Sequence, residues 1–191
     1  MRETFQSIAA EHQKAVTKSF DAHHIEVLEK ISREIIMAFK AGHKLLLCGN
    51  GGSAADSQHI AAEFIGRFKR ERRSLPAIAL TTDTSIITAV GNDYSYDQIF
   101  SRQVEGLGKK GDILIAISTS GNSKNVIHAV TLAKTMGLLT IGFTGASGGM
   151  LKEAADICFC AESKKTPHIQ EIHITTPHAI SEVVEDVFFG A

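Results

Sequence analysis

Five short segments of the chain are apolar almost without interruption, and helical patterns separate them. Apolar runs of this length are typical of strands in a parallel sheet that helices cover on both faces. In the intervening segments, apolar residues recur three or four positions apart, as on the buried face of a helix. This alternation predicts an α/β fold with a doubly wound, flavodoxin-like, five-stranded parallel sheet. The expected strands are residues 45–48, 76–80, 112–117, 139–143 and 157–161.

Two further helices are expected before the first strand. Residues 3–19 fit one helix, and apolar residues at helical spacing fit a second, which Gly42 ends. Two extra N-terminal helices are more than one face of the sheet requires. The apolar side chains of Phe5, Ile8 and Val16 therefore either pack against another subunit or belong to the ordinary core.

Composition and charge narrow the class of protein. The chain has 191 residues, 43% of them hydrophobic, and a net charge of −1. These values fit a single domain over residues 1–191 and give no electrostatic reason to expect nucleic acid or a membrane as a partner. No apolar run approaches the ~18 residues of a membrane span, and the N-terminus lacks the apolar core of a signal peptide. We therefore expect a cytoplasmic protein.

A glycine-rich turn follows the first strand. Gly49, Gly51 and Gly52 leave room for a ligand, so the backbone N–H groups from Asn50 to Ser53 can point at an anion. The positive end of the next helix faces the same place. The turn therefore predicts an anion-binding site, and the alternative is a tight strand-to-helix connection that binds nothing.

Two chemically reactive side chains lie on the helix after this turn. His59 and Glu63 are four residues apart, so both can converge on one atom. An anion site about two turns from such a pair suggests a phosphorylated substrate whose chemistry takes place at its other end.

The same turn also fits a dinucleotide-binding fingerprint. Gly49, Gly51 and Ala54 match G-x-G-x-x-A after a strand, and Asp83 closes the next apolar run. However, Asp83 lies farther along the chain than the usual ~20 residues, and the fingerprint gives the His/Glu pair no purpose. We keep this as a weaker alternative.

A hydroxyl-rich loop follows the third strand. Ser118, Thr119, Ser120 and Ser123 lie directly before a helix expected at 124–136. Four hydroxyls beside the N–H groups of a helix N-terminus suit the three terminal oxygens of a phosphate monoester. Capping of the helix by one serine is the plain alternative, but it explains one hydroxyl and not four. Because both loops follow the carboxyl ends of parallel strands, we expect them to serve one pocket.

Three other segments have structural interpretations. The sequence Gly-Asn-Asp at 91–93 is typical of a turn that ends a helix at 84–90. Residues 95–98 fit a capping box that opens a helix at 96–107. The basic stretch 67–73 is interpreted as a solvated helix end that complements the helix dipole, with a phosphate or nucleic-acid patch as the sharper alternative.

The last segment of the chain carries an unusual density of metal-ligand groups. They lie in a helix expected from about His168, and are Gln170, Glu171, His173 and His178. Pro177 gives this helix a reason to bend, which would let Gln170 and His178 approach one centre. Together with the earlier His/Glu pair, these groups form an N/O ligand set suited to zinc. The three cysteines are interpreted as reduced small hydrophobic residues.

Together, these motifs resemble a known family. The segments CGNGGSAADSQHIAAE, GND, ISTSGNS and IQEIH, followed by His178, are similar to those of the phosphoheptose isomerases of the SIS (sugar isomerase) fold. The likeness covers nearly the whole chain in the right order. It implies interconversion of sedoheptulose 7-phosphate and D-glycero-D-manno-heptose 7-phosphate, the first step toward ADP-heptose for the lipopolysaccharide core. It also implies a homotetramer with active sites between subunits.

The resemblance implies roles for individual residues as well. Substrate would be bound by Asn50, Gly51, Gly52, Ser53, Glu63, Asn92, Asp93, Ser118, Thr119, Ser120, Ser123 and Gln170. One zinc ion per subunit would be held by His59, Glu63, Gln170 and His178. Glu63 would be the base and His178 the acid of a proton transfer through a cis-enediol. The chain departs from the family pattern at 166–168, where an Asp is usual, and at Pro177.

A non-catalytic SIS adaptor, which binds a sugar phosphate and regulates a partner protein, is the second functional hypothesis. Such a protein needs the fold but does not need His59, Glu63 and His178 together. Their joint presence favours the enzyme.

Overall fold

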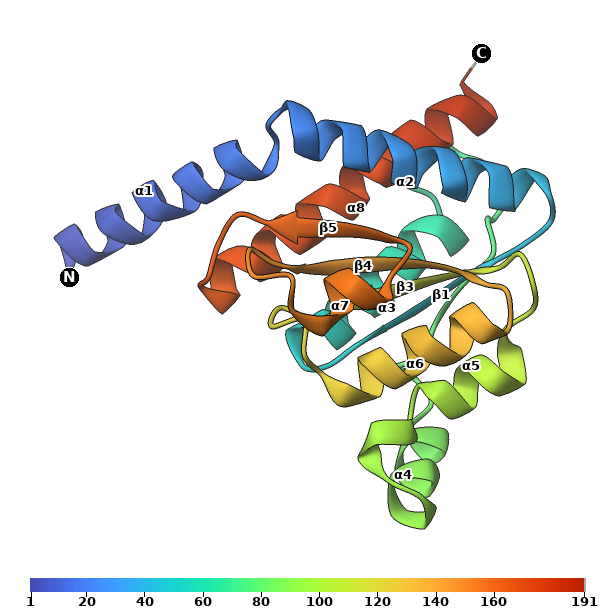
Figure 1. Cartoon of the computed structure of the whole chain (residues 1–191). Coiled ribbons are helices and arrows are strands. Elements are labelled where there is room, and N and C mark those ends of the chain that lie inside the picture. The colour runs from blue at the N-terminus through green and yellow to red at the C-terminus, as the bar shows by residue number, and fades with distance from the viewer. Residues whose placement is uncertain (191) are drawn as a thin grey trace.

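The structure, a computed structural model, describes residues 1–190. Its strands form one parallel sheet in the order β2-β1-β3-β4-β5 (Figure 1). They are β1 (Leu45–Gly49), β2 (Ala77–Ala79), β3 (Ile113–Ile117), β4 (Leu139–Gly145) and β5 (Ile157–Ala161). The prediction of a doubly wound, five-stranded parallel sheet is confirmed, with small differences at the strand ends.

Helices cover both faces of this sheet. One face packs against α2 (Ala22–Lys40), α3 (Gly52–Ile65) and α8 (Thr166–Phe189), and the other against α5 (Ser101–Leu107), α6 (Lys124–Thr135) and α7 (Gly149–Ala154) (Figure 1). The remaining helical elements are α1 (Arg2–Ser19), α4 (Thr84–Asp93) and the 3₁₀ helix η1 (Tyr96–Gln98). Within residues 1–190, none of the helices has both the length and the apolar composition needed to cross a membrane.

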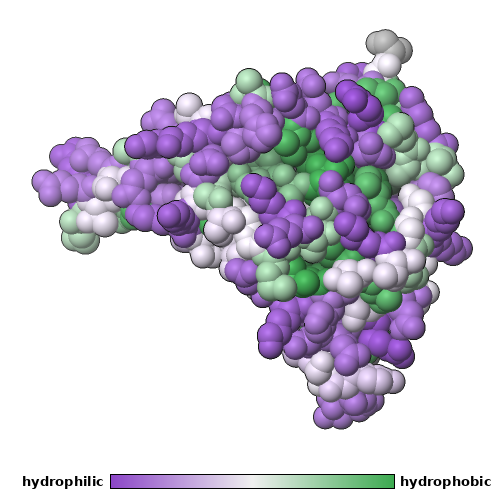
Figure 2. All heavy atoms as spheres, viewed as in Figure 1, coloured by the Kyte–Doolittle hydropathy of each residue, from purple (hydrophilic) through white to green (hydrophobic). Residues whose placement is uncertain are grey.

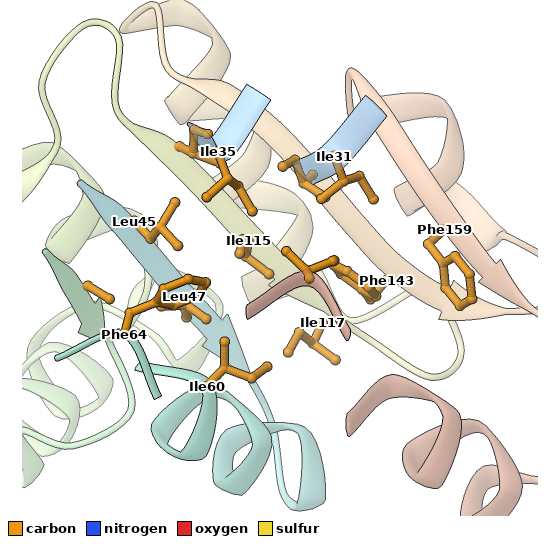
Figure 3. Close-up of a cluster of buried hydrophobic side chains, with 14 of the residues drawn as sticks. Ile31, Ile35, Leu45, Leu47, Ile60, Phe64, Ile115, Ile117, Phe143 and Phe159 are labelled. Atoms are coloured by element: carbon orange, nitrogen blue, oxygen red, sulfur yellow. The ribbon is translucent and has the colours of Figure 1, made fainter. Parts of the chain in front are cut away.

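Side chains of the central strand alternate between two hydrophobic clusters. Leu45 and Leu47 lie in the cluster under α2, α3 and α8, whereas Leu46 lies in the cluster under α5, α6 and α7. All three are fully buried, as expected for a strand covered on both faces. Burial contributes roughly 1.5–3 kcal/mol for each large apolar side chain. Figure 3 shows part of the first cluster, with Ile31, Ile35, Leu45, Leu47, Ile60, Phe64, Ile115, Ile117, Phe143 and Phe159 labelled.

The first helix, α1, projects beyond the sheet as an arm (Figure 1). Val16, near its C-terminal end, packs against the first cluster, but Phe5 is 71% exposed and Ile8 is 50% exposed. The visible surface of the arm is otherwise mostly hydrophilic (Figure 2). Val16 therefore belongs to the ordinary core. Phe5 and Ile8 remain on the surface, where packing against another subunit is still the open alternative.

The turn expected at 91–93 is wrong, because α4 continues through these three residues without a positive φ. The helix is capped at its start by Asp83, whose side chain accepts the N–H of Ile86 at 2.9 Å. At its end, the N–H of Tyr94 bonds to the carbonyl of Val90. A helix closed by its own backbone in this way needs no left-handed residue.

The helix expected at 96–107 is divided in two, and the capping box is wrong. Ser95 makes no side-chain capping bond to η1, and α5 begins only at Ser101. Between them, Ile99 and Phe100 are each only 2% exposed. Both keep right-handed helical backbone angles, and the N–H of Ile99 bonds to the carbonyl of Tyr96 three residues before it, so a 3₁₀ turn interrupts the α-helical hydrogen bonds.

One helix was not expected, because α7 lies in a segment predicted as a glycine-rich loop. Gly148 and Gly149, which precede and begin it, have φ values of 74° and 57°. These left-handed residues allow a sharp turn, after which Leu151 enters the second cluster fully buried. A helix of 6 residues gives too short a periodic pattern to be found in the sequence.

The basic stretch after α3 contains a buried ion pair. Arg72 and Glu185 of α8 have side chains only 1% and 2% exposed, and Nε of Arg72 lies 2.9 Å from Oε2 of Glu185. The same guanidinium donates hydrogen bonds to the carbonyls of Glu63, Phe64 and Gly66. The expected complement to the helix dipole is therefore present, but the expectation that this arginine is solvated is wrong.

The backbone supports the carboxylate of Glu185 as well. The N–H groups of Phe68, Lys69 and Arg70 all donate to it, at 2.6–3.1 Å. Burial acts to raise the pKa of Glu185, but Arg72 and these N–H groups outweigh it and hold the pKa below its usual range. One carboxylate thus joins α8 to the segment that follows α3.

We expect Glu185→Gln to lower the free energy of unfolding by about 3–5 kcal/mol, because it leaves the Arg72 charge buried without a partner. Arg70→Ala, which removes the exposed Arg70–Asp186 pair, is the control and should cost about 1 kcal/mol or less. Urea unfolding followed by circular dichroism measures both. Equal losses in the two variants would show that the buried pair has no special role.

The same pair predicts how stability depends on pH. Because the pKa of Glu185 is lower in the folded state, its stabilisation is complete above the unfolded-state value of about 4.3 and is lost as the pH falls through the folded-state pKa. Between pH 6 and pH 3, wild type should therefore lose more stability than Glu185→Gln in the same urea titration.

Candidate active site

The two predicted loops meet where the winding of the sheet reverses. Strands β1 and β3 are paired in parallel, with Gly49 opposite Ile117, the last residue of each. On the far sides of this pair lie β2 and β4. The loops that leave β1 and β3 therefore begin side by side at the carboxyl edge, where doubly wound folds bind their ligands.

The first loop is a tight turn in which the N–H groups of Gly51 and Gly52 stay open. Gly51 has a φ of 57°, and the N–H of Ser53 bonds to the carbonyl of Asn50. Within residues 1–190, no acceptor is bonded to the N–H of Gly51 or Gly52. Fewer N–H groups than predicted can therefore bind an anion, because the N–H of Ser53 is already bonded within the turn.

Gln170 of α8 lies against this loop. A Cβ atom on Gly52 would come within 2.2 Å of its Nε2, so any other residue at 52 would displace it. The glycine therefore allows the amide of Gln170 to approach the turn.

The second loop gathers its hydroxyls in one place. Oγ of Ser118 lies 3.0 Å from Oγ of Ser123 and 3.5 Å from Oγ of Ser120. Ser123 is the N-cap residue of α6, but its side chain makes no capping bond. Simple helix capping therefore does not account for this serine, and its hydroxyl is directed to that of Ser118.

Three ligand-type side chains converge between α3 and α8. Nε2 of His59 lies 2.9 Å from Nε2 of His178 and 3.2 Å from Oε1 of Glu63, and the third distance is 4.0 Å. They come from α3 and α8, whose positions the Arg72 carbonyl contacts and the Glu185 pair hold. Among residues 1–190, they are the group of three or more His, Cys, Asp or Glu side chains close enough to share a metal ion.

The geometry of this triad fits a catalytic zinc site. Ligand atoms about 2.0–2.1 Å from a tetrahedral ion lie ~3.3 Å apart, close to the three distances here. Two imidazoles and one carboxylate supply three ligands, and the amide of Gln170 is the predicted fourth. The side chains of His59 and His178 are 52% and 36% exposed, so an ion and a substrate can reach them.

Asp56 is a neighbour of the triad that the sequence analysis did not single out. It lies three residues before His59 on α3, and its Oδ2 is buried without a hydrogen-bond partner among the described residues. Burial raises the pKa of Asp56 to about 6, although His59 acts to lower it. Its place on the helix, one turn before a predicted ligand, was the available signal.

Other residues singled out in the sequence lie outside the triad. His173 is fully buried, its Nε2 lies 3.0 Å from the carbonyl of Thr144, and burial lowers its pKa to about 4. Glu171 instead contacts His12 of the arm at 2.9 Å. Both therefore have structural positions, and neither adds to the ligand set.

The remaining predicted substrate residues lie on α4. Asn92 and Asp93 are exposed, and the amide of Asn92 donates to Asp93 at 2.8 Å. Figure 1 shows α4 projecting from the body of the protein. In the single chain they are bonded to one another and not to either loop.

Comparisons with known proteins identify the family of the chain. A family model described as "SIS domain" matches residues 10–145. The phosphoheptose isomerase of Roseiflexus sp. (strain RS-1) is 58% identical over 159 residues, which cover 83% of this chain and 81% of that protein. The chain belongs to the phosphoheptose isomerase family of SIS-domain proteins.

Further members of the family match over most of the chain. The phosphoheptose isomerase of Nitratidesulfovibrio vulgaris is 48% identical over 192 residues, 99% of this chain and 92% of that protein. The solved structure of phosphoheptose isomerase GmhA from Neisseria gonorrhoeae has a TM-score of 0.92 at 39% identity, covering 97% of this chain and 98% of that one. The fold of the family is therefore present along the described chain.

We expect the chain to bind one zinc ion at the triad. Loss of an outer-shell partner typically lowers metal affinity ~10–100-fold, so His59→Ala, which removes a direct ligand, should lower it at least as much. His23→Ala, at an exposed histidine of α2, is the control and should bind as wild type does. Isothermal titration of metal-free protein with zinc measures both. Equal affinities in the two variants, or no zinc bound by wild type, would rule the site out.

Proposed function

We infer that the chain is a sugar-phosphate isomerase that interconverts sedoheptulose 7-phosphate and D-glycero-D-manno-heptose 7-phosphate. The observation that carries this conclusion is the triad of His59, Glu63 and His178, in a chain whose glycine-rich and hydroxyl-rich loops leave the switch point of the sheet side by side. The relatives named phosphoheptose isomerase support the choice of substrate. In this role the chain supplies heptose phosphate for the ADP-heptose of the lipopolysaccharide core.

The two loops divide the substrate between them. The gathered hydroxyls of Ser118, Ser120 and Ser123, with Thr119, bind the phosphate at the start of α6. The sugar lies over the first loop, where the backbone from Asn50 to Ser53 and the amide of Gln170 contact its oxygens. We also assign Asn92 and Asp93 to substrate binding, which requires α4 to approach the loops or a second copy of the chain to supply them.

Glu63 and His178 move the protons. Aldose–ketose exchange transfers a proton between C1 and C2, and the carboxylate of Glu63 can take it from one carbon and return it to the other. His178 manages the protons of the neighbouring oxygens as the cis-enediol forms. When bound by His59, Glu63, Gln170 and His178, zinc would polarise the carbonyl and orient the two oxygens.

The triad also favours the enzyme over a regulatory SIS adaptor. An adaptor would need the loops that bind a sugar phosphate, but it would gain nothing from two imidazoles and a carboxylate within 4.0 Å of each other.

We place the reaction in the cytoplasm.

Glu63→Gln should lower kcat by ~10²–10⁴-fold with little change in KM, because the amide keeps the shape but cannot accept a carbon-bound proton. Glu105→Gln changes an exposed glutamate of α5 and serves as the control. Conversion of sedoheptulose 7-phosphate, followed by NMR in deuterated solvent, measures turnover and exchange at C1 together. More than a tenth of wild-type turnover in Glu63→Gln would exclude it as the base.

We also propose that the chain forms a homotetramer in which the arm packs against other copies, with the active sites between subunits. Phe5 and Ile8 are exposed on the arm, and burying each would contribute roughly 1.5–3 kcal/mol. The triad is itself open to solvent, which suits a site completed by another subunit.

The double variant Phe5→Ser/Ile8→Ser should dissociate the tetramer at micromolar concentration, because it removes the apolar surface of the arm. Met150→Ser changes an equally exposed apolar residue on α7 and should leave the mass unchanged. Light scattering reports the mass of each. A monomeric wild type, or a double variant that stays tetrameric, would contradict the proposal.

A further inference from the structure

Three side chains form a hydrogen-bonded network that joins the two loops. Asn50 of the first loop and Asn125, in the first turn of α6, exchange two amide hydrogen bonds of 2.9 Å each. The hydroxyl of Tyr96, in η1, lies 2.9 Å from Oδ1 of Asn50. We call Asn50, Asn125 and Tyr96 the loop clasp. It connects the segment after β1, the segment after β3 and the segment after α4.

The backbone determines the direction of every bond in the loop clasp. The N–H of Val126 donates to Oδ1 of Asn125 at 2.9 Å, so that atom is the amide oxygen. The nitrogen of Asn125 must then donate to Oδ1 of Asn50, and the nitrogen of Asn50 must donate in return. Because Oδ1 of Asn50 is an acceptor, the hydroxyl of Tyr96 is its donor.

Burial makes the central pair of this clasp hard to replace. Asn125 is only 2% exposed, and a buried amide without partners is costly. The side-chain partner of Asn125 is Asn50, so the amide of Asn125 keeps its hydrogen bonds only while the first loop stays in place. The oxygen of Asn50 is fully used by two donors, so its side chain serves the clasp more than the substrate.

We propose that Asn125 and Tyr96 are positioning residues for isomerisation, acting through Asn50. The effect on the reaction rests on the proposed function, whereas the hydrogen bonds of the loop clasp do not depend on it. One substrate must span both loops, with its phosphate at Ser118 and Ser123 and its reacting carbons over Glu63. The distance between the loops therefore sets where C1 lies. A displacement of about 1 Å at a reacting centre can cost ~10²-fold in rate.

The experiment compares Asn125→Ala with Gln103→Ala. Gln103 is also a buried amide, 5% exposed, which bonds to the carbonyls of Leu80 and Ile99 and not to either loop. We expect Asn125→Ala to lower kcat for sedoheptulose 7-phosphate by about 10–100-fold. Gln103→Ala should lower Tm about as much as Asn125→Ala does, because both remove a buried amide. It should keep the wild-type kcat when assayed well below its Tm. Tyr96→Phe, at an exposed side chain, should lower kcat by about 2–10-fold with Tm unchanged.

A double variant tests whether the residues act as one unit. Asn50→Ala and Asn125→Ala break the same pair of bonds, so the double variant should be little worse than the more damaging single variant. Fully additive losses would overturn the proposal. So would a kcat within twofold of wild type in Asn125→Ala, or an equal loss in Gln103→Ala.

Hydrogen exchange separates this proposal from the proposed function. In Asn125→Ala, and not in Gln103→Ala, exchange should quicken at the N–H groups of Ser53 and Ala54, which the turn protects. An inactive wild type with this exchange pattern would refute the isomerase and keep the clasp. An active wild type with no change in loop exchange would keep the isomerase and refute the clasp. If Asn125→Ala does not fold, Tyr96→Phe decides by its kcat alone.

Discussion

The parallel pairing of β1 with β3 is the constraint on which the site depends. The chain winds from β1 to β2 on one side and then returns to place β3 on the other. Gly49 and Ile117 therefore end their strands as neighbours, and the segments that follow open at one edge of the sheet. Hydrophobic burial on both faces of β1 and β3 stabilises this pairing. The nearness of the two loops is thus a consequence of core packing, and the loop clasp only refines it.

The triad depends on a second constraint, the packing of α3 against α8. Arg72 bonds to carbonyls at the end of α3, and the partner of its charge, Glu185, belongs to α8. Because desolvation offsets much of the Coulomb attraction of a buried ion pair, apolar residues could provide similar stability. They could not bond to the carbonyl of Glu63. The directional bonds of this pair therefore favour a role in orientation, since they hold the residues that carry His59 and His178 at one geometry.

Local patterns were enough to predict most of the fold. Continuous apolar runs identify buried strands, and the four-residue spacing of His59 and Glu63 places both on one face of a helix. The sequence failed where small local preferences compete. Gly-Asn-Asp at 91–93 favours a turn, yet α4 continues through these residues and is closed by the backbone bond from Tyr94 to Val90. The buried state of Arg72 could not be predicted either, since a basic run normally lies in solvent and its partner is far away in the chain.

The same reasoning explains which residues of the site could not be predicted from the sequence. Asn125 has no chemistry of its own to attract notice, and its importance comes from being buried opposite Asn50. The hydrogen bonds between Asn50 and Asn125 are partly buried, whereas the imidazole of His59 is more than half exposed. Enediol chemistry benefits from exclusion of water, and the single chain does not provide it at the triad. Two elements, α1 and α4, project from the body of the protein (Figure 1). The exposure of the triad in the single chain is the physical argument for completing the site with a second subunit.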